Sequence, residues 1–146
     1  MKAAVFHAPH QPLTIENVEI EKPKRREVLL RTAYAGLCHS DLHFMEGLYP
    51  FPTPAVLGHE GAAVVEAVGE DVTYVKPGDH VITCLSVFCG ECAQCVTGHT
   101  NLCENTEVKL LPGAARRMKW KGEVLNQAFN LSAFAEQMLV HEHAIV

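Results

Sequence analysis

The chain has 146 residues, 48% of them hydrophobic, which suits one globular domain with a core of its own. Its formal net charge is −5, from 12 basic and 17 acidic residues, and this balance argues against a nucleic-acid partner. Pro9 interrupts the N-terminus before a signal peptide could form, and no run of about eighteen apolar residues occurs, so the sequence predicts a soluble cytoplasmic protein with no membrane segment.

Short segments rich in branched apolar residues, separated by Gly and Pro, predict a mainly β fold. In chain order the predicted strands are 2–7, 13–20, 27–35, 62–68, 80–83 and 134–140. One short helix is predicted over 39–46, where Ser40 can cap the first turn. The sequence Lys-Pro-Gly-Asp at 76–79 predicts a turn, because Pro presets φ and Gly accepts a positive φ. Segment 106–127 has no clear periodicity, so we expect a long loop there.

Four cysteines with the spacing C-x2-C-x2-C-x7-C give the strongest chemical signal in the sequence. They are Cys89, Cys92, Cys95 and Cys103. Four thiolates at this spacing can surround one zinc ion and leave no open position for substrate, which predicts a structural site. A redox pair, an iron–sulfur cluster or two disulfides are the alternatives, but a redox pair needs only two cysteines, cluster motifs are spaced differently, and a reducing compartment disfavours disulfides. Cys84, at a strand end, is expected to be a small buried side chain.

A second candidate metal site combines Cys38 with His59, twenty-one residues later. Either residue alone is more often part of a core than a ligand. Together, a thiolate and an imidazole near the ends of β segments, each with a carboxylate beside it, are typical of an open zinc site.

These motifs resemble the zinc-dependent medium-chain alcohol dehydrogenases. The likeness is carried by GLCHSD at 36–41, GHEG at 58–61, VKPGDHV at 75–81 and the four-cysteine segment, in the family's order. The resemblance implies a GroES-like, partly open β-barrel over residues 1–146, with short helices and a zinc-binding lobe at 89–103. It also implies oxidation of an alcohol to an aldehyde or ketone, with hydride transfer to NAD or NADP.

The resemblance further assigns roles to single residues. Cys38 and His59 look like two of three protein ligands of a catalytic zinc, the third being a cysteine beyond position 146. Ser40 resembles the hydroxyl that takes the alcohol proton, and His43 a later member of the proton relay. A helix cap and a surface histidine are the competing interpretations of these two residues. His39 stands where the family places a basic residue near the cofactor pyrophosphate.

The resemblance also suggests roles for four further positions. Asp41 looks like the carboxylate that orients the zinc-binding histidine, although local turn hydrogen bonds could also explain it. Glu60 resembles the acid that can approach the zinc transiently. Tyr49 and Leu85 fall where the family lines its substrate pocket, with ordinary packing as the alternative. His141-Glu142-His143 is expected to lie on a solvated strand edge with no functional role.

The dinucleotide-binding half of such enzymes is not visible in this sequence. The ten glycines include no G-x-G pair, so no Rossmann turn is predicted. We therefore expect the chain by itself to be inactive, to retain the sulfur-bound zinc, and to hold a catalytic zinc weakly or not at all. The full-length enzyme is expected to be a homo-oligomer. The alternatives are a non-catalytic, zinc-stabilised GroES-like binding module and a zinc-free quinone-reductase relative, against which the cysteines argue.

Overall fold

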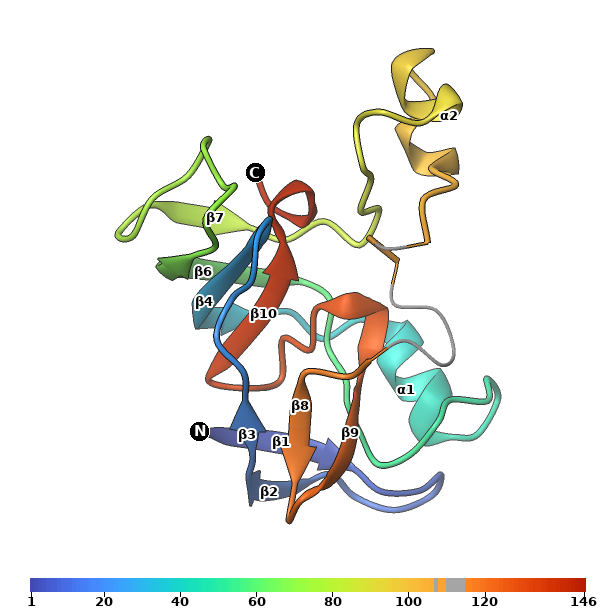
Figure 1. Cartoon of the computed structure of the whole chain (residues 1–146). Helices are drawn as coiled ribbons and strands as arrows, with labels where there is room; N and C mark the ends of the chain where they lie inside the picture. The colour runs from blue at the N-terminus through green and yellow to red at the C-terminus, as the bar shows by residue number, and fades with distance from the viewer. Residues whose placement is uncertain (107, 110–114) are drawn as a thin grey trace.

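The computed structural model describes residues 1–106, 108–109 and 115–146, and β-strands dominate them (Figure 1). One sheet has the strand order β2(Thr14–Asn17), β1(Lys2–Phe6), β5(Ala55–Val56), β9(Glu123–Gln127), β8(Met118–Trp120), β3(Glu19–Ile20). The other has the order β10(Gln137–His141), β4(Glu27–Ala35), β6(Gly61–Val68), β7(His80–Ile82). The short helices are α1(His39–Met45), α2(Ala93–Val96), η1(Thr100–Leu102), η2(Ala128–Asn130) and η3(Glu142–Ala144). The predicted fold class, a mainly β, barrel-like domain, is confirmed.

The long strand β4 organises the smaller sheet, because it pairs antiparallel with both β6 and β10. Alternate residues of its first half point inward, so Val28 and Leu30 are fully buried. They share one apolar core with Val65 and Met138 from the neighbouring strands. Burial of each such side chain contributes about 1.5–3 kcal/mol, so this strand holds its flanking loops in fixed positions.

The larger sheet joins segments that are far apart in sequence. Strand β5 pairs parallel with β9, with Ala55 opposite Asn126, and antiparallel with β1. The buried side chains of this sheet include Val5, Met118 and Leu125, which belong to a second apolar core. The two sheets together give the partly open barrel seen in Figure 1.

Segment 106–127 differs from its prediction, because β8 and β9 form an antiparallel hairpin in its second half. Lys121 and Gly122, with φ of 52° and 82°, form the two-residue turn between them. The prediction of one long loop is therefore wrong here. Positions 107 and 110–114 of that segment lie outside the described residues.

The other predicted elements agree with the structure in type. Strand β4 matches its predicted range, and helix α1 ends one residue earlier than expected. The predicted strand 13–20 is split at Val18, whose side chain is buried, and the strand expected at 134–140 begins at Gln137. The turn at 76–79 is present, with Asp79 N donating to Lys76 O at 3.1 Å. Within the described residues, no helix is long and apolar enough to cross a bilayer.

The segment with the four cysteines projects from the barrel as a separate lobe (Figure 1). It carries α2 and η1, and its interior consists of the cysteines with Phe88 and Val108 packed against them. A lobe with so few apolar side chains cannot be stabilised by hydrophobic burial alone.

Candidate metal centres

The four cysteine sulfurs of the lobe converge on one point. All four Sγ atoms lie within 4.8 Å of one another, and all four thiols are free. The Sγ–Sγ distances are 3.5 Å for Cys92–Cys95, 3.9 Å for Cys89–Cys95 and 4.0 Å for Cys92–Cys103. A tetrahedral zinc site with bonds of about 2.3 Å requires sulfurs about 3.8 Å apart, whereas a disulfide needs about 2.05 Å. The sulfurs are therefore spaced to hold a metal ion and not to form disulfides.

The backbone of the lobe supports ionised sulfur. Cys89 Sγ accepts from the N–H groups of Glu91 at 3.4 Å and Cys92 at 3.3 Å, and these bonds lower the pKa of Cys89. Backbone N–H donors, first that of Glu104, lower the pKa of Cys92 to about 6. Burial raises the pKa of Cys95 to about 11. A buried thiol of this kind loses its proton when a cation binds beside it, so the set fits a metal ion.

The second candidate centre lies at the ends of three strands. Cys38 follows β4 at the start of α1, while His59 and Glu60 lie between β5 and β6. Each of the three offers one ligand atom, and these atoms lie within 4.8 Å of one another. They line a cavity of about 690 Å³ whose wall also contains Leu85. The structure therefore brings Cys38 and His59 together as the sequence predicts.

Ser40 is directed at this pair and does not cap the helix. Its Oγ lies 3.3 Å from Cys38 Sγ and 3.4 Å from His59 Nε2. Cys38 itself occupies the N-cap position, without a side-chain cap hydrogen bond. The interpretation of Ser40 as a plain helix cap is therefore excluded, and its hydroxyl faces the ligand atoms.

Asp41 supports the imidazole from the opposite side. Its Oδ1 lies 3.6 Å from His59 Nδ1 and accepts a hydrogen bond from Gly58 N at 3.0 Å. The hydrogen bond of this carboxylate is therefore to a distant part of the chain and not within a local turn. Both side chains are buried, with His59 7% and Asp41 4% exposed. Among the described residues His59 Nδ1 has no hydrogen-bond partner, and the facing carboxylate is placed to accept a hydrogen bond from Nδ1–H when Nε2 binds a cation.

Glu60 reaches the site because residue 36 is glycine. A Cβ on Gly36 would lie 2.2 Å from Glu60 Oε2 and 2.9 Å from Glu60 Cβ. The backbones of the two residues are also joined, since Gly36 N donates to Glu60 O at 2.7 Å. The missing side chain thus provides the space that the carboxylate occupies.

The aromatic residues of α1 make ring contacts with one another and with Tyr49. The His43 ring makes edge contacts with His39 at 4.5 Å and with Tyr49 at 5.1 Å between centroids. Within the described part of the chain, neither histidine hydrogen-bonds to Ser40. His43 is half-buried in this stack, so it is not a solvated surface residue. Leu85 lines the cavity as predicted, whereas Tyr49 is not among its lining residues.

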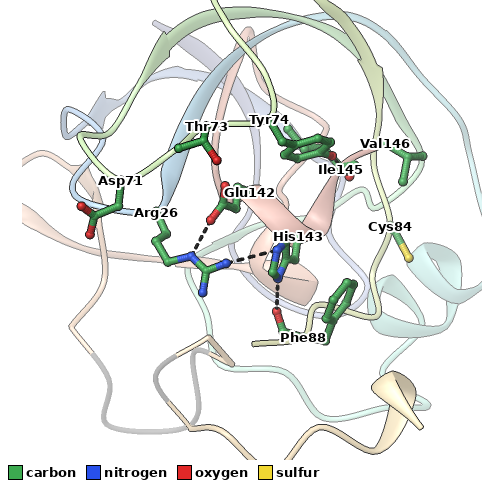
Figure 2. Close-up of a pocket in the computed structure, with 10 residues that line it drawn as sticks. All are labelled: Arg26, Asp71, Thr73, Tyr74, Cys84, Phe88, Glu142, His143, Ile145 and Val146. Carbon is green, nitrogen blue, oxygen red and sulfur yellow. Dashed lines mark hydrogen bonds and ion pairs between the residues drawn. The ribbon is translucent and has the colours of Figure 1, made fainter. Parts of the chain in front are cut away.

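Two other expectations are wrong. Cys84 is exposed, because its side chain lines the walls of two neighbouring cavities. His141-Glu142-His143 is not a solvated strand edge, since the strand ends at His141 and Glu142 turns into the interior, 4% exposed. There Glu142 pairs with Arg26, for which the sequence predicts no role (Figure 2).

Comparisons with known proteins agree with this geometry. The family model "Alcohol dehydrogenase GroES-like domain" matches residues 24–146. The S-(hydroxymethyl)glutathione dehydrogenases of Haemophilus influenzae and of Escherichia coli are each 44% identical over 146 residues, covering 97% of this chain and 39% and 40% of the relative. The chain thus spans about two fifths of these relatives.

Two solved structures are similar as well. An alcohol dehydrogenase zinc-binding domain protein from Burkholderia ambifaria superimposes with a TM-score of 0.89 and 39% identity, over 99% of this chain and 40% of that one. Benzyl alcohol dehydrogenase from Acinetobacter calcoaceticus gives 0.85 and 32%, with the same coverage. The chain therefore belongs to the GroES-like domain family of the zinc-dependent alcohol dehydrogenases.

Proposed function

We propose that residues 1–146 form the catalytic domain of a zinc-dependent alcohol dehydrogenase that oxidises an alcohol to an aldehyde or ketone, with NAD or NADP as the hydride acceptor. The observation that carries the proposal is that Cys38 and His59 line one cavity and that Ser40 Oγ lies within 3.4 Å of both ligand atoms. Similarity to alcohol dehydrogenases over nearly the whole chain supports the same reaction.

Two zinc ions belong to this proposal. Cys89, Cys92, Cys95 and Cys103 hold a structural ion, whose four sulfur ligands leave no open position. Cys38 and His59, with Glu60 in reach, hold a catalytic ion together with a further ligand from outside these residues. A zinc ion there supplies a Lewis acid, which favours loss of the proton from an alcohol.

The residues around the catalytic ion have separate tasks. Ser40 Oγ can accept the alcohol proton and donate its own, because a hydroxyl does both. Asp41 fixes the His59 ring so that Nε2 faces the cavity, which makes it a positioning residue. His43 continues the proton path towards solvent, and His39 lies near the cofactor pyrophosphate.

The cavity also limits the substrate class. Tyr34, Ile82 and Leu85 give it an apolar wall beside the ligand atoms, which suits a small alcohol or aldehyde with an apolar carbon chain. The cofactor is bound by a Rossmann domain outside these residues, and the complete enzyme is a cytoplasmic homo-oligomer. The 146-residue chain by itself does not oxidise alcohols.

Titration of the metal-free chain with Co²⁺ tests the catalytic centre. We expect two binding phases, a tight one from the four-cysteine lobe and a weaker one that adds a single sulfur-to-cobalt absorption. The Cys38→Ser variant loses the weaker phase. The Cys84→Ser variant, which changes another thiol of the same cavity, keeps both. A second phase that survives Cys38→Ser contradicts the proposal.

A further inference from the structure

The polypeptide enters the four-cysteine lobe through Phe88 and Cys89, and the barrel holds both backbone carbonyls. Arg26 Nη1 donates to Cys89 O at 3.3 Å. The Nδ1 of His143 lies 2.9 Å from Phe88 O, within hydrogen-bond distance. Arg26 immediately precedes β4 and His143 lies in η3 after β10, so both residues flank strands that pair with each other.

Arg26 is itself held in place by Glu142. Its Nε donates to the Glu142 carboxylate, which is almost fully buried, and Glu142 N donates to Arg26 O at 2.8 Å. Its Nη2 lies 3.1 Å from His143 Nε2 (Figure 2). A guanidinium group can serve three partners in one plane, which a lysine cannot do.

His143 also fixes the lobe by packing. Its ring stacks on Phe88 with 4.4 Å between centroids and an interplanar angle of 16°. A Cβ on Gly90 would lie 3.3 Å from His143 Cε1, so the chain passes close over the ring at the first turn of the lobe. The entrance of the lobe is therefore held against the barrel by hydrogen bonds and by ring stacking.

The position of Cys89 in turn affects two of the four sulfurs. Its own Sγ is one ligand atom, and its N–H donates to Cys103 Sγ at 3.3 Å. If Cys89 moves away from Arg26, its sulfur is displaced and Cys103 loses a donor. The polar atoms of Arg26, Glu142 and His143 are engaged with one another and with the lobe, so they are arranged for support and not for binding a ligand in the adjacent cavity.

We propose that Arg26, Glu142 and His143 form a clamp on the entrance of the four-cysteine lobe, and that opening of this clamp controls how fast the lobe releases its metal. The proposal rests on the metal site proposed above for Cys89, Cys92, Cys95 and Cys103. Local opening is governed by the contacts that close a segment, and in the lobe those contacts are few.

The test measures transfer of zinc from the loaded chain to a chromogenic chelator, in a Cys38→Ser background that removes the other centre. About one zinc ion per chain before transfer establishes that the lobe holds a metal. A chain without bound zinc would refute the proposed metal site itself, independently of the clamp. The Arg26→Lys variant keeps a positive charge beside Glu142 but loses the guanidinium group that contacts three partners. The His143→Phe variant keeps the ring stacked on Phe88 but loses the hydrogen bonds of the imidazole. Both should release zinc roughly ten- to hundredfold faster, as outer partners of metal ligands typically affect binding.

Arg117→Lys is the matched control, because Arg117 bridges Glu21 and Glu27 by the same chemistry and, among the described residues, makes no ion pair with the lobe. Unfolding of the barrel is followed in each variant by the fluorescence of Trp120, the single tryptophan, which lies in the larger sheet. Faster release with an unchanged Trp120 transition supports the clamp. Unchanged release, equal acceleration in Arg117→Lys, or release only together with Trp120 unfolding would overturn it.

Discussion

Glu60 illustrates how a single missing side chain can position a charged group. Its carboxylate lies where the Cβ of any other residue at position 36 would lie, next to Cys38 and His59. The backbone of Gly36 needs no unusual dihedral angle for this, so the space alone accounts for the glycine. Replacement of Gly36 should therefore act on the centre through Glu60 and not through backbone strain.

For the Gly36→Ala variant we expect loss of the weaker Co²⁺ phase or a roughly tenfold lower affinity for it, because the added methyl group displaces Glu60 and the adjoining backbone. The four-cysteine phase should not change, since that lobe lies elsewhere in the molecule. Cobalt titration measures both phases in one experiment. Identical titration curves for the variant and the parent would show that Glu60 does not contribute.

His141 gives the stability of the protein a pH dependence. Burial, followed by the positive charges of His143 and Arg26, lowers the pKa of His141 from 6.5 to about 4. The unfolded chain therefore binds a proton between about pH 6.5 and 4 that the folded chain does not, and the free energy of unfolding falls as the pH falls through this range.

In the His141→Gln variant this fall should be smaller by roughly 1–2 kcal/mol, a figure reduced for the partial exposure of the ring. Glutamine can still accept the hydrogen bond from His143 N. Urea unfolding at a series of pH values measures the effect, with a glutamine at the exposed His80 as control. Equal pH profiles for the parent and the His141→Gln variant would contradict this assignment.

Residues close together in sequence were predictable, and residues joined only by the fold were not. Cys38, Ser40 and Asp41 share one helical turn, so their motif already suggests a common site. Arg26 and Glu142 are 116 positions apart, and only the pairing of β4 with β10 brings them together. Arginine and glutamate side chains are ordinarily solvated, so nothing in their local sequence indicates a buried pair.

At the level of elements, the hairpin β8–β9 was the main structure missing from the prediction. Its strands are short, and its turn uses Lys121-Gly122, whereas Asn-Gly is the usual signal for this geometry. Alternation over three to five residues is too brief to distinguish from chance. By contrast, β4 has nine residues and is rich in apolar side chains, and its predicted bounds match the structure.

The Gly122→Ala variant should lose about 1–2 kcal/mol of stability, because alanine resists the positive φ of 82° while no neighbouring atom lies within 4 Å of its Cβ. Urea unfolding followed by Trp120, the residue before the turn, reports on this hairpin directly. A matched Glu123→Ala change, just after the turn, should cost less. Equal stability of the Gly122→Ala variant and the parent would show that the turn relaxes freely.

At the scale of the whole molecule, barrel and lobe are stabilised by different means. The barrel has extended apolar cores in both sheets, whereas the interior of the lobe is mainly sulfur. A chelator strong enough to remove zinc should therefore disorder the lobe and leave the barrel folded. Protease cleavage between positions 89 and 103, with an unchanged Trp120 unfolding transition, is the expected result. Complete unfolding on chelation would mean that the metal supports the barrel too.

The sequence distances of the contacts have a consequence for synthesis of the protein on the ribosome. Cys89 and Cys103 are 14 positions apart, so their loop can close as soon as that stretch has emerged. The sheets depend on partners such as β5 with β9 and β4 with β10, and both β9 and β10 are synthesised after the four-cysteine lobe. A growing polypeptide can thus capture a metal ion before either sheet is complete, and cellular zinc supply would act on the nascent chain as well as on the finished protein.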